Sequence, residues 1–243
     1  MEKKKLFRDD TDRRRFLKTL TSVMEETETS CLAFALMTNH IHLQIITGTT
    51  PLSTVMQKLL TSYAVYFNLR HNRTGKLYQN RFKSVLCDKE EYLLQLVRYI
   101  HLNPVKAHIV ESMRKLDSYK WTSHSVYMGK QNNDFIDTEE ILSHFGRTET
   151  DARREYRKFI QAGLDIEEPV DFEGGGLIRS LGGYWETLKK ARGGKRNKQA
   201  ADERILGSGT FVEEVLKAAE EKEDRQSRLK RKGYTLKKVE KKV

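Results

Sequence analysis

The sequence predicts an α+β fold in which an antiparallel sheet is covered by helices. A continuous apolar run from Cys31 to Met37 is followed by Thr38-Asn39 and by an alternating segment from His40 to Ile46. An apolar strand, a short polar turn and an alternating strand are typical of a β-hairpin. Two segments with apolar residues at helical spacing, 12–28 and 52–69, flank this hairpin. Helices before and after a hairpin favour an α+β fold.

The two flanking segments have the signals expected of amphipathic helices. The first has Asp9, Asp10 and Asp12 at its start, and their carboxylates suit a helix N-terminus. Its apolar residues recur every three or four positions, as one buried helix face requires. The second segment has a broader apolar stripe and is predicted to cover the sheet. The apolar positions of the two segments are Phe16, Leu20, Val23 and Met24, and Leu52, Val55, Met56, Leu59, Leu60, Tyr63, Tyr66 and Phe67.

Charge and composition favour an anionic partner in a reducing compartment. The 243 residues have a formal net charge of +11. Nucleic acid is the first candidate, although many basic proteins do not bind it. Cys31 and Cys87 are isolated, so no disulfide framework or Cys-x-x-Cys metal site is expected. No apolar run is long enough to span a membrane, and the start lacks a hydrophobic signal core. We therefore expect a cytoplasmic protein without a membrane partner.

Two short motifs place polar side chains where they can act together. On a strand, His40 and His42 share one face, so two imidazoles can hold one cation. The segment 90–102 is predicted to be helical, and the four-residue step from Tyr99 to Asn103 places a phenol and a carboxamide on one helix face. Other interpretations are a structural histidine pair, a core tyrosine and, because Pro104 follows, an Asn103 that merely ends the helix. Gln95, one turn before Tyr99, is an alternative orienting group.

A basic and aromatic segment lies between the second helix and this motif. Residues 70–83 are predicted to form a glycine-containing turn followed by a strand-like stretch in which cations and aromatic rings alternate. Lys76, Arg81 and Lys83 can neutralise phosphates, while Tyr78 and Phe82 can stack on unpaired bases. The alternative is a solvated hairpin whose aromatic residues belong to the core.

Three motifs in order resemble the single-tyrosine transposases of the His-hydrophobe-His endonuclease superfamily, most closely the REP-associated type. They are Thr38-Asn-His-Ile-His-Leu43, Gly75-Lys-Leu-Tyr-Gln-Asn-Arg-Phe-Lys83 and Arg98-Tyr-Ile-His-Leu-Asn-Pro-Val-Lys-Ala107. The resemblance covers about residues 6–129 and implies a ferredoxin-like (RRM-like) antiparallel sheet. It also implies His40, His42 and Asn103 as metal ligands, Tyr99 as the nucleophile, and Arg98 and Lys106 as further DNA-binding residues.

The implied reaction is the cleavage and rejoining of single-stranded or hairpin DNA through a 5'-phosphotyrosine intermediate. A phenol with a pKa of about 10 needs a phosphate polarised by a divalent ion, and the resemblance implies Mg²⁺ or Mn²⁺. Two imidazoles and an amide oxygen would also accept zinc or nickel. A catalytically inactive DNA-binding remnant is the alternative, and a structural metal-binding protein is a third hypothesis. A homodimer is left open.

The chain differs from the family pattern at both ends. Relatives begin with a strand that pairs with the histidine strand, and that strand is not found here, so we expect reduced stability and activity. We predict a catalytic domain over residues 1–146 and a basic helical extension over 147–243. Within the extension, residues 151–162 are predicted to be helical, Ser208 precedes an amphipathic helix, and Lys237 and Lys238 belong to a basic end. Paired glycines, such as Gly182-Gly183, are interpreted as joints.

Overall fold

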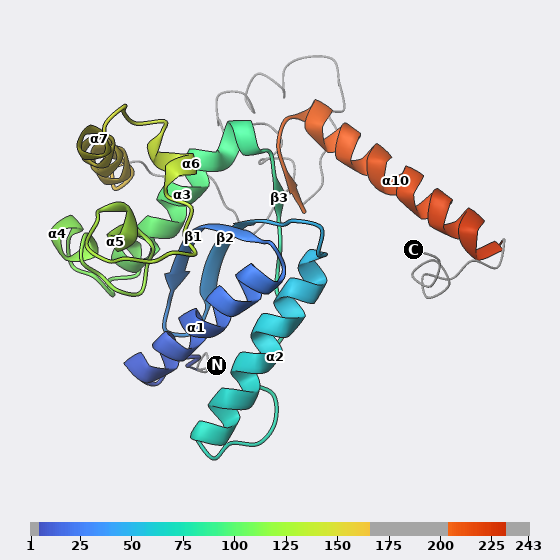
Figure 1. Ribbon diagram of the computed structural model, residues 1–243, viewed down its shortest axis with the longest axis horizontal. Helices are drawn as coiled ribbons and strands as arrows, with labels where there is room; N and C mark the ends of the chain where they lie inside the picture. The colour runs from blue at the N-terminus through green and yellow to red at the C-terminus, as the bar shows by residue number, and fades with distance from the viewer. Residues whose placement is uncertain (1–4, 166–203, 232–243) are drawn as a thin grey trace, which may run out of the picture. The chain divides into compact units, whose positions relative to one another are not determined.

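The computed structural model describes residues 5–165 and 204–231. The chain divides into two compact units: one joins residues 1–83 with 94–167, and the other joins 84–93 with 168–243. The described residues form an α+β structure with small sheets and several helices (Figure 1), as the sequence predicted. The predicted domain boundary at residue 146 stays a prediction, and the glycine pair 182–183 and lysines 237–238 lie outside the described residues.

Helix α1 (Asp10–Glu26) begins where the sequence supplies a cap. The Asp9 carboxylate accepts hydrogen bonds from the backbone N–H groups of Thr11 and Asp12, at 2.9 and 3.0 Å. These N–H groups have no partner inside a helix, so a carboxylate at the N-terminus stabilises it. Arg70 donates to the same carboxylate at 2.8 Å and, with the capping bonds, holds the pKa of Asp9 well below its ordinary value. The cap thus also ties α1 to the end of α2.

The predicted hairpin is present. Strand β1 (Ser30–Leu36) pairs antiparallel with β2 (Ile41–Ile46), with Ala35 opposite His42 and Leu36 opposite Ile41. The N–H of Met37 donates to the carbonyl of His40 at 3.0 Å and closes the turn at Thr38-Asn39. Almost all of β1 is buried, whereas β2 is only half-buried. The second strand therefore carries its polar side chains at the border of the core.

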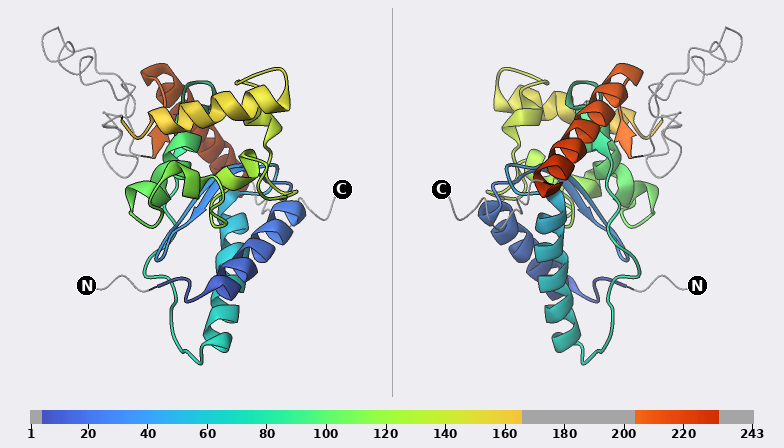
Figure 2. Two further views of the ribbon diagram at one scale, coloured as in Figure 1. Left: turned by 90° about the vertical axis from the view of Figure 1, so that its left-hand side faces the viewer. Right: turned by 90° about the vertical axis from the view of Figure 1, so that its right-hand side faces the viewer.

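Helix α2 (Leu52–Arg70) buries one apolar face against α1. Phe7, Phe16 and Tyr63 meet there with ring centroids 5.1 to 5.7 Å apart. Burying one such ring contributes about 2 kcal/mol, so this cluster is a substantial part of the core. The Tyr63 hydroxyl keeps a partner by donating to the carbonyl of Leu6 at 2.7 Å. Two further views show α1 and α2 side by side next to the hairpin (Figure 2).

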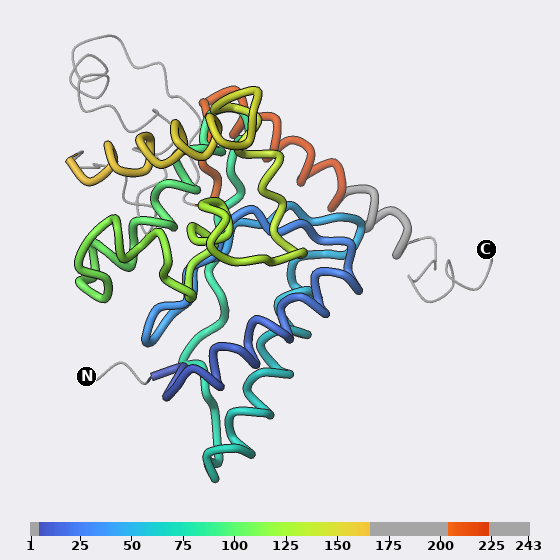
Figure 3. Tube along the Cα trace, turned by 60° about the vertical axis from the view of Figure 1, so that its left-hand side comes forward, coloured from blue at the N-terminus to red at the C-terminus, as the bar shows by residue number. Residues whose placement is uncertain are grey.

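The segment after residue 107 covers the edge of β1 that does not pair with β2 (Figure 3). It contains the short helices α4 (Met113–Leu116), α5 (His124–Tyr127) and α6 (Glu139–Leu142), followed by α7 (Glu149–Ala162). Leu36 N–H donates to the carbonyl of Trp121 at 2.8 Å, and Ser123 N–H donates to that of Phe34 at 3.0 Å. These bonds satisfy backbone groups that an open strand edge would leave unpaired.

Two sequence-based predictions were wrong in detail. Helix α3 (Lys89–Lys106) starts near the predicted residue but continues through Pro104 instead of ending at residue 102. A proline costs the helix one N–H donor, and packing on both sides tolerates that loss here. The segment 70–83, predicted to be strand-like after its turn, has no strand, and the next strand is β3 (Leu86–Cys87). The alternation of cations and rings in this segment therefore does not indicate strand pairing.

The second unit contains β3, which pairs parallel with β4 (Ile205–Leu206), and helix α10 (Gly209–Arg231). Ser208 caps α10 as predicted, because its hydroxyl accepts from the N–H of Phe211 at 3.2 Å. Among the described residues, the first unit has a sheet of two strands, so the ferredoxin-like order stays a prediction. No described helix is long and apolar enough to cross a membrane.

Candidate active site and metal centre

The structure brings His40 and His42 together at the start of β2. His40 immediately precedes the strand, and His42 lies inside it opposite Ala35. Their ring centroids are 4.8 Å apart with the rings nearly perpendicular. Nδ1 of His40 lies 2.7 Å from Oδ1 of Asn39, which fixes one edge of that ring. The alternation of side chains along a strand accounts for the pairing, as the sequence predicted.

His42 has the chemical state that a metal ligand needs. Its Nε2 atom is buried and has no hydrogen-bond partner among the described residues. Burial, and to a lesser degree the neighbouring His40, lowers the pKa of His42 to about 4. The ring is therefore neutral at physiological pH, and a neutral imidazole is the form that binds metals. A buried nitrogen without a partner is costly, and a bound cation would remove that cost.

Helix α3 brings Tyr99 to the histidine pair. The ring centroids of Tyr99 and His42 are 5.6 Å apart in an edge-to-face arrangement. One turn later, Nδ2 of Asn103 donates to the carbonyl oxygen of Tyr99 at 2.8 Å. With the amide assigned in this way, Oδ1 of Asn103 is the atom left for a ligand. Gln95, the alternative orienting group, is exposed.

The donor set fits a divalent cation. No group of three His, Cys, Asp or Glu side chains in the described part of the chain could hold a metal ion. If an ion binds here, its protein donors would be the two imidazole nitrogens and the amide oxygen of Asn103. Three protein ligands leave open positions, which a catalytic site needs and a closed structural site lacks. The orphaned Nε2 of His42 is the observation that favours an ion at this place.

The predicted DNA-binding residues fall into two groups. Lys76, Arg81, Lys83 and Lys106 are exposed. The other two are half-buried: the guanidinium of Arg98 lies 4.7 Å from the ring centroid of Phe159, and the buried Tyr78 hydroxyl has no hydrogen-bond partner among the described residues. The exposed cations can approach a phosphate from the solvent side.

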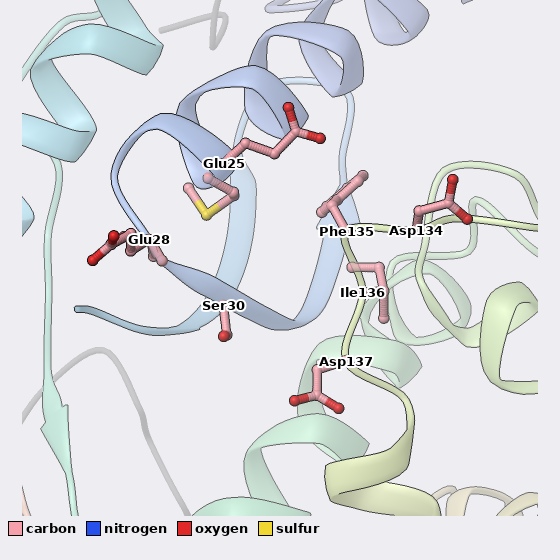
Figure 4. A pocket seen from close by; sticks show the side chains of 9 residues that line it. Glu25, Glu28, Ser30, Asp134, Phe135, Ile136 and Asp137 are labelled. Carbon is pink, nitrogen blue, oxygen red and sulfur yellow. The ribbon is translucent and has the colours of Figure 1, made fainter.

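A separate hollow lies between the end of α1, the start of β1 and the loop before α6 (Figure 4). None of the predicted site residues lines it. The carboxylates of Glu25, Glu28, Asp134 and Asp137 surround it, so its charge repels phosphate. A phosphate would therefore be disfavoured in this hollow.

Sequence reasoning missed the residues that pack beneath the tyrosine. His101 is fully buried, and its ring nitrogens pair with the hydroxyls of Tyr156 and Ser123. Ser123 and Tyr156 are 22 and 55 residues away along the chain, so no local periodicity connects them. The one available signal was a histidine between Tyr99 and Asn103 on the buried side of the helix.

A histidine pair on a strand thus lies beside a tyrosine on a helix, and these are residue types that metal-assisted nucleophilic sites use. Residues 1–103 match the family described as "Transposase IS200 like", so this segment is similar to the IS200-like transposases. The matched segment contains His40, His42, Tyr99 and Asn103. Comparison with curated proteins and with solved structures found no match.

Proposed function

We propose that this protein is a DNA transposase that cleaves and rejoins single-stranded DNA through Tyr99. The match of residues 1–103 to the IS200-like transposases supports DNA transposition as the general function. The observation that carries the finer proposal is the Tyr99 ring beside His42, whose buried Nε2 has no partner among the described residues. A nucleophile and a cation site in contact are what phosphodiester cleavage requires.

In the proposed step, the phenol oxygen of Tyr99 attacks the phosphorus of the scissile phosphate. A bond from the tyrosine oxygen to phosphorus forms, and the bond from phosphorus to the 3'-oxygen breaks. The phenol proton passes to solvent, and the departing 3'-oxygen takes up a proton. The products are a 5'-phosphotyrosine and a free 3'-hydroxyl, and the covalent bond preserves the energy needed to rejoin strands.

His40, His42 and the amide oxygen of Asn103 would hold a divalent cation, with Mg²⁺ or Mn²⁺ as the proposed ions. A cation there supplies Lewis-acid polarisation of the phosphate. The chain's own contribution is position, because Asn103 is tied to the Tyr99 backbone and His42 packs against the Tyr99 ring. Four exposed cations are proposed to hold the DNA backbone: Lys76, Arg81, Lys83 and Lys106. Tyr78 and Arg98 are half-buried members of the same proposed DNA-binding surface.

The experiment combines the full chain with labelled single-stranded hairpin DNAs from the flanks of its own gene and Mg²⁺ or Mn²⁺. Denaturing electrophoresis then compares wild type, Tyr99→Phe and the matched control Tyr66→Phe on α2. A metal-dependent covalent band in wild type and in the control, absent in Tyr99→Phe, is the expected result. DNA that is retarded in a native gel but never becomes covalently attached would contradict the proposal and favour a protein that only binds DNA.

A further inference from the structure

A continuous network of buried hydrogen bonds holds the face of α3 that carries His101. His101 lies between Tyr99 and Asn103 in sequence and is fully buried. Its Nε2 is 2.6 Å from Oγ of Ser123, and that oxygen accepts a hydrogen bond from the N–H of Phe34 in β1 at 2.9 Å. The same hydroxyl lies 3.4 Å from the carbonyl of Phe34, a much weaker contact. The Ser123 proton therefore belongs to His101.

The direction of the remaining bonds follows from that assignment. Because Nε2 of His101 accepts, Nδ1 carries the proton and donates to the Tyr156 hydroxyl. Tyr156 then donates to Nδ1 of His124, at 3.2 Å, and Nε2 of His124 donates to Asp117 at 3.0 Å. The second oxygen of Asp117 accepts from Nε of Arg157 at 2.8 Å. Each hydroxyl and each ring N–H of His101, Ser123, His124 and Tyr156 then has an acceptor, which buried polar networks need in order to be stable.

This network connects the two halves of the proposed active site. Phe34 of β1 lies opposite Leu43 of β2, next to His42. His101 lies on α3, the helix that carries Tyr99. Hydrogen bonds to Ser123 and Tyr156 hold the His101 ring in place. The distance between the nucleophile and the histidine pair is thus set through side chains that touch neither.

Most of the network lies beyond the matched family segment, which ends at residue 103. Asp117, Ser123, His124, Tyr156 and Arg157 all come from the part of the chain that follows it. Helix α7 packs closely here, since a side-chain carbon at Gly163 would approach the Arg98 and Leu102 side chains of α3 to 2.6 and 2.8 Å. The helical segment after residue 103 therefore forms the support of α3.

We infer that His101, Ser123 and Tyr156 are positioning residues for cleavage, and that they hold the Tyr99 helix in register with the histidine strand. This inference rests on the proposed function of Tyr99. A displacement of about 1 Å at a reacting group can cost about 100-fold in rate, so removing one hydroxyl from this network should slow the chemical step. Binding of DNA, which involves other residues, should not change.

The test compares Tyr156→Phe with Tyr63→Phe in the full chain. Each variant loses one buried tyrosine hydroxyl and keeps the ring, but Tyr63 donates to Leu6 between α1 and α2, outside the network. The measurements are the single-turnover rate of covalent adduct formation at saturating DNA, the DNA Kd and the melting temperature. We expect Tyr156→Phe to slow adduct formation by about 10-fold or more with an unchanged Kd, and Tyr63→Phe to leave the rate unchanged.

Equal rates in the two variants would overturn the inference. If Tyr156→Phe does not fold, Ser123→Ala replaces it, because it removes the single hydroxyl between His101 and β1. If wild type forms no adduct, the proposed function fails, and hydrogen exchange over residues 97–106 decides the inference separately. Faster amide exchange there in Tyr156→Phe than in Tyr63→Phe would show that the network holds α3 in place. Identical exchange in the two variants would refute the inference.

Discussion

Two groups of two histidines and a tyrosine lie on α3 and its neighbours, and they differ in one respect. In the first, His40 and His42 meet Tyr99, and Nε2 of His42 is buried without a partner among the described residues. In the second, every ring nitrogen of His101 and His124 is hydrogen-bonded, to Tyr156, Ser123 or Asp117.

This difference distinguishes a candidate ligand-binding site from a structural hydrogen-bond network, which we call the support. A nitrogen whose lone pair or proton is already used stabilises the fold and has nothing to offer a ligand. A buried nitrogen left unpaired costs stability, and such groups occur where a ligand or ion supplies the partner. Residue type alone would not distinguish the two groups, whereas their hydrogen bonds do.

The largest expected effect comes from His42→Ala. Losing one of the metal-binding imidazoles should reduce metal-dependent cleavage by about 1000-fold, equivalent to the several kcal/mol that a cation contributes to such a step. Stability should change little, because the deleted ring has a nitrogen that lacks a partner in the described structure. Adduct assays and thermal melts of the same sample measure both. If the variant keeps its cleavage rate or unfolds, His42 is a structural residue like His101 and His124.

His124→Ala should have the opposite pattern. It removes a donor to Asp117 and an acceptor for Tyr156 inside the core, so we expect the free energy of unfolding to fall by about 2–4 kcal/mol. Urea denaturation monitored by tryptophan fluorescence gives this value. Metal affinity, measured by calorimetry below the melting temperature, should be unchanged. A large loss of metal affinity without a loss of stability would break the comparison.

The buried hydrogen-bond network around His124 should also make the stability of the protein sensitive to mild acid. Burial lowers the pKa of His124, against the opposing effect of Asp117. In the unfolded chain a histidine takes up its proton below a pH of about 6.5, whereas folded His124 resists protonation. Stability is therefore highest above that pH and falls as the pH drops below it. Urea midpoints at pH 7.5 and 5.0 test this, with His124→Gln as the comparison. An equally large decrease in that variant would assign the sensitivity to other groups.

The smallest expected effect belongs to the exposed cations. Arg81→Gln should weaken binding of single-stranded DNA by about 3- to 10-fold and reduce the salt dependence by the equivalent of one phosphate contact. Lys115→Gln is the control, since Lys115 is exposed but paired with Glu111 on the same short segment. Fluorescence anisotropy at several salt concentrations measures both variants. Equal affinities would remove Arg81 from the DNA-binding surface.

Local patterns in the sequence predicted the elements that depend on local chemistry. The caps of α1 and α10, the apolar stripes of the first two helices and the alternation in β2 follow from residues a few positions apart. The histidine pair was predictable for the same reason, because alternate residues of a strand share a face. Its approach to Tyr99 was suggested only by resemblance to a family, since no physical pattern links β2 with α3.

The features that escaped prediction depend on packing between distant residues. Helix α3 continues through Pro104, and its buried His101 is hydrogen-bonded to Ser123 and Tyr156, which are distant in sequence. Residues 76–83 contain cations and rings in alternation, yet no neighbouring strand pairs with them in the described structure. A buried histidine, serine and tyrosine have no periodicity in common, so the network is visible only in three dimensions.

The central claim is that Tyr99 attacks DNA beside a cation held by His40 and His42. The most direct test is to trap the adduct with Mn²⁺ present, trim the DNA with nuclease, digest the protein and locate the modified peptide by mass spectrometry. The account predicts a nucleotide attached through its 5'-phosphate to Tyr99, and no adduct when the metal is chelated. An adduct on another residue, or one that forms equally well without metal, would contradict it.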